Sequence, residues 1–203
     1  MTPDQESLAF FREFAGAIQQ WQYVELALCE VAKASSGQAQ GVIYHHFYGG
    51  GLRSFESRLQ YANSLISTKL KTTQFQDDWR SLYSRIRDDA QERNKIAHYL
   101  LLITPGKKPG RRYGLWPPLA KATKTTCIRP EVLPASGVLG LRDLWLRARR
   151  FSESAALLTN LASRLQGRPP PFPPNIPIPA RAPTLAHFVK EIQELARGMS
   201  LAE

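Results

Sequence analysis

The chain has 203 residues, of which 27 are Lys or Arg and 17 are Asp or Glu, giving a formal net charge of +10. Hydrophobic residues make up 43% of it, which suits one folded core with appended segments. The longest apolar runs fall well short of the roughly 20 residues that a membrane helix needs. Two cysteines exclude a cysteine-rich metal domain. We therefore expect a cytoplasmic protein that uses no membrane, metal or cofactor and whose basic surface favours a polyanion.

The first half of the chain predicts three helical regions. Apolar residues recur at three- and four-residue steps over residues 5–34, 40–70 and 74–101. The first region should end at Ser35-Ser36-Gly37, and Gly49-Gly50-Gly51 should kink or interrupt the second.

The second half predicts an insertion over residues 102–135, a fourth helix over 140–166 and a Pro-rich segment after Gly167. The insertion has three candidate strands that form a small β-meander: Leu101–Ile103, Arg112–Trp116 and Thr125–Ile128. The Pro-rich segment should act as a strap that leads to a last helix at Leu185–Leu201. The sequence thus predicts an all-α bundle of about four main helices over residues 1–166, followed by the strap and C-terminal helix over 167–203.

Arg93 stands where the third helical region should bury an apolar residue. It falls within an apolar arc centred on Trp79, Ile86, Ala90 and Ala97. A guanidinium on a buried face is costly unless it has a partner. Glu25 lies on the apolar face of the first helical region, so a Glu25–Arg93 ion pair that fixes the helix register is one interpretation.

The residues that follow Arg93 favour a second interpretation. In Arg93-Asn94-Lys95-Ile96-Ala97-His98, Asn94 and His98 are four residues apart and share one helix face. A pair that only fixes the register needs neither of these side chains.

This six-residue segment resembles the R-x4-H motif of the HEPN superfamily of all-α domains, in which a polar residue typically follows the arginine. Trp21-Gln22-Tyr23-Val24-Glu25 and Ser54-Phe55-Glu56-Ser57-Arg58-Leu59 also look like segments of bacterial members of that family. The resemblance covers residues 5–165, apart from the insertion. It implies a helical bundle that forms a homodimer and places two motifs side by side. Many members are metal-independent endoribonucleases of toxin–antitoxin or defence systems, and others have lost activity and serve as binding domains.

The residue types suit RNA cleavage without a metal ion. Histidine can exchange a proton near neutral pH, and arginine offers a planar fork to phosphate oxygens. We therefore expect His98 to act as acid and base and Arg93 and Asn94 to bind the scissile phosphate, with Glu25 in a supporting role. On an ideal helix, side chains five residues apart diverge by about 140°, so Arg93 and His98 need a helix bend or a second copy of the chain to converge.

Basic and aromatic residues gather in the insertion. The candidate RNA-binding residues there are Lys107, Lys108, Arg111, Arg112, Tyr113 and Trp116. A solvated surface loop that Trp116 anchors to the bundle explains the pattern equally well.

Two functions follow from the sequence. The first is a dimeric, metal-independent endoribonuclease with RNA as substrate and an antitoxin or another protein as partner. The alternative is a catalytically inactive helical domain that binds nucleic acid, a nucleotide or a partner protein. Under the first, His98→Ala should abolish cleavage with little loss of stability; under the second, Arg93→Ala should mainly unfold the protein.

Overall fold

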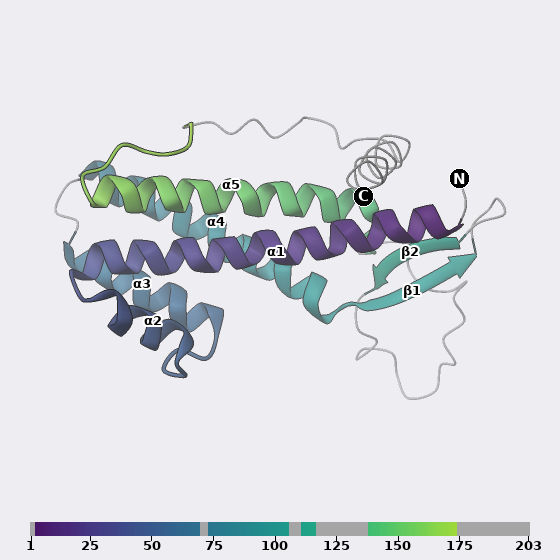
Figure 1. Cartoon of the computed structure of the whole chain (residues 1–203), viewed down its shortest axis with the longest axis horizontal. Coiled ribbons are helices and arrows are strands. Elements are labelled where there is room, and N and C mark those ends of the chain that lie inside the picture. Colours follow the sequence, from purple (N-terminus) through teal and green to yellow (C-terminus); the bar gives the residue numbers. More distant parts are fainter. Residues whose placement is uncertain (1–2, 70–72, 106–110, 117–137, 174–203) are drawn as a thin grey trace, which may run out of the picture. The chain divides into compact units, whose positions relative to one another are not determined.

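A computed structural model of the chain describes residues 3–69, 73–105, 111–116 and 138–173 (Figure 1). These residues are mostly helical, which confirms the all-α class. In chain order, the elements are α1 (Pro3–Ser36), α2 (Gln40–Tyr48), α3 (Phe55–Lys69), α4 (Thr73–His98), β1 (Leu100–Pro105), β2 (Arg111–Trp116) and α5 (Leu141–Leu165). No helix in this part of the chain has the length and apolar character needed to cross a bilayer.

The described residues belong to two compact units. One takes its residues from Met1–Ala17 and Asn94–Arg147, and the other from Ile18–Arg93 and Ala148–Ile178. We call the first the hairpin unit, because it contains β1 and β2, and the second the bundle unit.

Glycines end or separate the helices of the bundle unit where the sequence predicts breaks. Gly37 follows the last residue of α1 with a φ of 67°, in the left-handed region that favours glycine. The second helical region is interrupted between α2 and α3, and Gly50 adopts a φ of 101° there. Ser54 then caps α3, because its Oγ accepts a hydrogen bond of 3.0 Å from the backbone N–H of Ser57.

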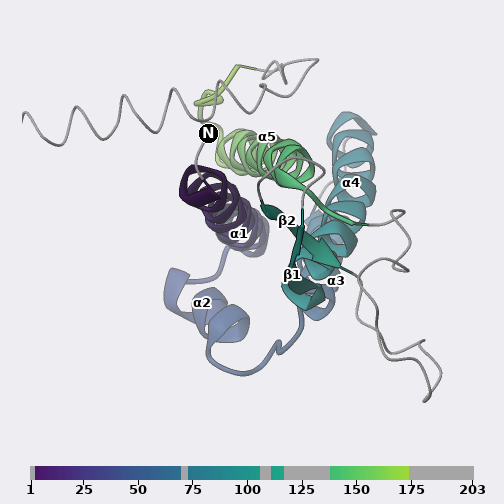
Figure 2. The same ribbon diagram turned by 90° about the vertical axis from the view of Figure 1, so that its right-hand side faces the viewer.

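Aromatic residues join the helices of the bundle unit. The Trp21 ring of α1 lies 4.6 Å from that of Phe55 on α3 and 5.3 Å from that of Phe151 on α5, measured between centroids. On α4, the Trp79 indole N–H donates to Asn63 of α3 over 2.8 Å. Within this unit, α2 lies on the side of α1 that faces away from α5 (Figure 2).

Helices α4 and α5 run antiparallel in the bundle unit. Ion pairs and hydrogen bonds join Asp78 to Arg164 and Arg85 to Ser154, so residue numbers rise along one helix as they fall along the other. Helix α5 ends in a Schellman-type turn, in which the N–H of Arg168 donates to the carbonyl of Ser163 over 2.9 Å. The Pro-rich segment begins directly after this turn.

The hairpin unit is built on the antiparallel pair β1 and β2, with Leu100 opposite Trp116 and Pro105 opposite Arg111 (Figure 1). A single bridge with paired backbone hydrogen bonds joins Leu115 to Leu139. The predicted helix to Leu101 was too long, because α4 ends at His98 and Leu100 already pairs in the hairpin. Two of the three predicted strands are present; the third, Thr125–Ile128, and the C-terminal helix lie outside the described residues.

Candidate functional site

The motif Arg93, Asn94 and His98 occupies the last two turns of α4, and His98 is the final helical residue. The side chains of Asn94 and His98 are exposed, whereas Arg93 is half-buried and its Nε is enclosed. Asn94 and His98 share a helix face, and Arg93 diverges from His98 by about 140°. The histidine is therefore exposed to solvent, and the arginine projects from a different face of the same helix.

The buried stripe of α4 agrees with the predicted arc at Trp79 and Ile86 but lies one residue earlier in the second half of the helix. Its members are Trp79, Leu82, Ile86, Asp89 and Ile96, all under 9% exposed. Ala97, predicted to be buried, is exposed, because the larger Ile96 takes the inward position. Arg93 still fits the stripe, since it is four residues after Asp89 and three before Ile96.

Glu25 does not form the predicted ion pair with Arg93. Its carboxylate accepts a hydrogen bond of 2.9 Å from the indole N–H of Trp21 and pairs with the guanidinium of Arg58 over 3.0 Å. The sequence placed Glu25 and Arg58 on helices of the same bundle but did not indicate that α3 lies against this part of α1. Glu25 thus supports the packing of α1 and α3 rather than Arg93.

A second acidic residue, missed in the sequence, lies one helical turn before Arg93. Asp89 is fully buried; it accepts a hydrogen bond of 2.6 Å from the Oγ of Ser154 and forms an ion pair with the Nε of Arg150. Burial raises the pKa of Asp89, while Ser154 and the guanidinium groups of Arg150 and Arg85 act in the opposite direction. The spacing of Trp79, Ile86 and Arg93 contains the signal, because Asp89 falls on the same stripe.

The hydroxyl of Ser154 links this acid to further charges on α4 and α5. It accepts a hydrogen bond of 2.9 Å from the Nε of Arg85, whose terminal amino group pairs with Glu153 over 2.5 Å. Two arginines and two acidic residues therefore balance one another around Ser154. We call Arg85, Asp89, Arg150, Glu153 and Ser154 the α4–α5 polar cluster.

The candidate RNA-binding residues of the insertion are only partly described. Lys107 and Lys108 lie outside the described residues, while Arg111, Arg112, Tyr113 and Trp116 belong to β2. Tyr113 is half-buried, and its ring lies 6.0 Å from that of Phe10 and 6.2 Å from that of Phe11. These contacts hold β2 against α1 within the hairpin unit and use part of the ring that was predicted to stack on a base.

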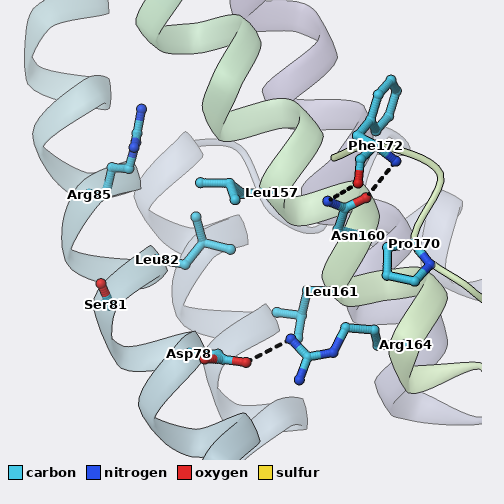
Figure 3. Close-up of a pocket in the computed structure, with 10 residues that line it drawn as sticks. All are labelled: Asp78, Ser81, Leu82, Arg85, Leu157, Asn160, Leu161, Arg164, Pro170 and Phe172. Carbon is cyan, nitrogen blue, oxygen red and sulfur yellow. Dashed lines mark hydrogen bonds and ion pairs between the residues drawn. The ribbon is translucent and has the colours of Figure 1, made fainter. Parts of the chain in front are cut away.

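A pocket of about 480 Å³ lies between α4 and α5 in the bundle unit (Figure 3). Leucines line its middle, including Leu82 and Leu161, and the Asp78–Arg164 ion pair of 2.7 Å lies beside them. The side-chain amide of Asn160 holds one wall in place, because it donates to the carbonyl and accepts from the N–H of Phe172. These two hydrogen bonds attach the segment after α5 to the helix at this wall.

The described part of the chain contains neither a metal-binding cluster nor a reactive cysteine. No three His, Cys, Asp or Glu side chains there are placed to share a metal ion. Cys29 is buried, and burial raises the pKa of its thiol to about 11, so it is a poor nucleophile. Cys127 lies outside the described residues.

No protein-family model, curated protein or solved structure matches this chain.

Proposed function

We propose that this protein is a metal-independent endoribonuclease of the HEPN type. The observation that carries the proposal is the placement of Arg93-Asn94-Lys95-Ile96-Ala97-His98 at the end of one long helix, with Asn94 and His98 exposed and Arg93 on the buried stripe. This arrangement presents a proton-transfer group to solvent on the same helix end as a half-buried arginine.

Each residue has a defined task in the proposed reaction. His98 takes the proton of a ribose 2′-hydroxyl or returns a proton to the leaving 5′-oxygen. Arg93 balances the charge that develops on the phosphate, and Asn94 orients that phosphate by hydrogen bonding. The 2′-oxygen attacks the adjacent phosphorus and the bond to the 5′-oxygen breaks, so neither a metal ion nor a water molecule is needed for this step.

The proposed enzyme is a homodimer. On an ideal helix, Arg93 and His98 diverge by about 140°, so their side chains in one chain point in different directions. A two-fold axis beside this helix end brings Arg93 of one chain toward His98 of the other, and two-fold dimers are the commonest oligomers of this kind. We expect α1 and α4 to supply the contact surface.

An alternative is a helical domain without catalytic activity that binds a nucleotide or another small molecule. The pocket between α4 and α5 favours it, because about 480 Å³ is within the usual range for ligand sites. Under this alternative, the exposed His98 has no chemical task.

Incubation with total RNA in the presence of EDTA tests the proposal. The wild type should cleave RNA, and His98→Ala should lose the activity by at least about 100-fold while keeping its melting temperature. His45→Ala is the matched control, because His45 is also exposed and lies on α2. Absence of cleavage by the wild type, or full activity of His98→Ala, would overturn the endoribonuclease proposal.

A further inference from the structure

The α4–α5 polar cluster lies next to the motif along α4. Asp89 precedes Arg93 by four residues, which corresponds to about 6 Å along the helix axis, and both belong to the bundle unit. Asp89 is fully buried, yet its ion-pair partner Arg150 has 41% of its side chain exposed. The cluster therefore extends from the buried Asp89, one helical turn before Arg93, to the partly exposed Arg150.

Arg150 contacts Asp89 through one edge of its guanidinium. The contact uses Nε, and the side chain as a whole is partly exposed. A guanidinium anchored in this way has lost much of its rotational freedom but can still present two N–H donors to a phosphate.

A purely structural function explains the cluster poorly. Burying a carboxylate is costly, and well-packed apolar residues often stabilise a helix pair as well or better. The acid has Ser154 as a second partner, and Ser154 is itself held by Arg85, so the carboxylate has little freedom to move. An acid fixed in this way gives Arg150 a defined position.

We propose that Arg150 binds an RNA phosphate adjacent to the scissile one, and that Asp89 is the positioning residue that aims it. This inference rests on the proposed endoribonuclease function, because it takes Arg93 as the contact to the scissile phosphate. The substrate is single-stranded RNA whose backbone runs from Arg93 to Arg150 within the bundle unit.

Salt-dependent binding of a fluorescent single-stranded RNA, measured by anisotropy, tests the phosphate contact. All variants carry His98→Ala so that the RNA stays intact. Loss of one phosphate contact lowers the slope of log affinity against log salt by about 0.7 for a single strand. Arg150→Ala should show this decrease. Arg87→Ala removes the same charge from an exposed position on α4 and should leave the slope unchanged.

Two further variants separate this role from folding. In Asp89→Asn/Arg150→Ala no buried charge lacks its partner, so the double variant should fold and show the same decrease in slope as Arg150→Ala. Asp89→Asn alone keeps the charge of Arg150 and should keep the slope. In the enzyme that retains His98, Asp89→Asn should raise KM several-fold with kcat nearly unchanged, because Arg150 keeps its charge but is aimed less well, and it does not contact the reacting phosphate.

The outcomes distinguish the two proposals. If the wild type cleaves RNA but the slopes of Arg150→Ala and the double variant equal that of Arg87→Ala, the assignment of Arg150 is wrong and the endoribonuclease proposal stands. If the wild type neither binds nor cleaves RNA, both proposals fail.

Discussion

At the scale of single residues, two acidic side chains on the inner faces of helices form ion pairs that their spacing in the sequence does not predict. Glu25 pairs with Arg58, and Asp89 with Arg150 and Ser154. Helical periodicity correctly places an acid on the inner face of each helix, but it carries no information about which residue of another helix lies opposite. The predicted Glu25–Arg93 pair was wrong for this reason.

Removing Arg58 should destabilise the protein. Its side chain and that of Glu25 are less than 20% exposed, so Arg58→Ala leaves a largely enclosed carboxylate with only the Trp21 hydrogen bond. We expect a loss of about 1–3 kcal/mol in the free energy of unfolding, measured by urea titration. Arg80→Ala breaks an ion pair of similar length with Asp77 whose side chains are more than 70% exposed, and should cost less than about 0.5 kcal/mol. Equal losses in the two variants would contradict the prediction.

The raised pKa of Asp89 predicts how stability changes with pH. The folded protein binds a proton at Asp89 more readily than the unfolded chain does. Stability from this residue is therefore fully present below the ordinary pKa of about 3.9 and is lost as pH rises through the folded value. The Asp89→Asn variant has no ionisable group at this position, so its stability lacks this dependence on pH. Urea titrations from about pH 4 to pH 7 should show the wild type losing stability relative to Asp89→Asn; an unchanged or opposite difference would contradict this.

At the scale of elements, the sequence predicted the helices well because local signals define them. The bounds of α1 and α5 agree with the predicted ranges within about two residues, and the glycine run separates α2 from α3. The end of α4 was predicted three residues too late, because Leu100 and Leu101 continue an apolar pattern that also suits a strand. The hairpin partner decides between the two, and that partner is more than ten residues away in the sequence.

Two glycines near one break should respond differently to alanine. Gly50 has a φ of 101°, which alanine adopts only with strain. Gly41 lies in the first turn of α2, and the position that an added Cβ would take is open. Gly50→Ala should lower the free energy of unfolding by about 1 kcal/mol or more, and Gly41→Ala should be neutral or slightly stabilising. Thermal unfolding of both variants checks the contrast, and a Gly50→Ala protein as stable as the wild type would contradict it.

At the scale of the whole molecule, the proposed chemistry depends on more than one chain. The sequence predicted Arg93, Asn94 and His98 as site residues from their spacing and from the family resemblance of the motif. The same spacing argues that a single ideal helix cannot bring the arginine and the histidine together. The sequence could not identify Asp89 and Arg150 as neighbours of the motif, because their pairing depends on the antiparallel register of α4 and α5. The composition gives the whole chain a net charge of +10, which favours binding of polyanions at low salt.

Mixing two inactive variants tests the shared site directly. If each site takes Arg93 from one chain and His98 from the other, a dimer of Arg93→Gln with His98→Ala contains one intact site and one site that lacks both groups. Equal mixing makes about half of the dimers mixed, so activity should return to about a quarter of the wild-type value. The mixture is unfolded and refolded together, and circular dichroism checks that each variant folds by itself. Each variant refolded alone is the control. Recovery of a quarter of the wild-type activity requires that two chains contribute to one site. No recovery of activity from two folded, dimeric variants would place Arg93 and His98 of each site on the same chain.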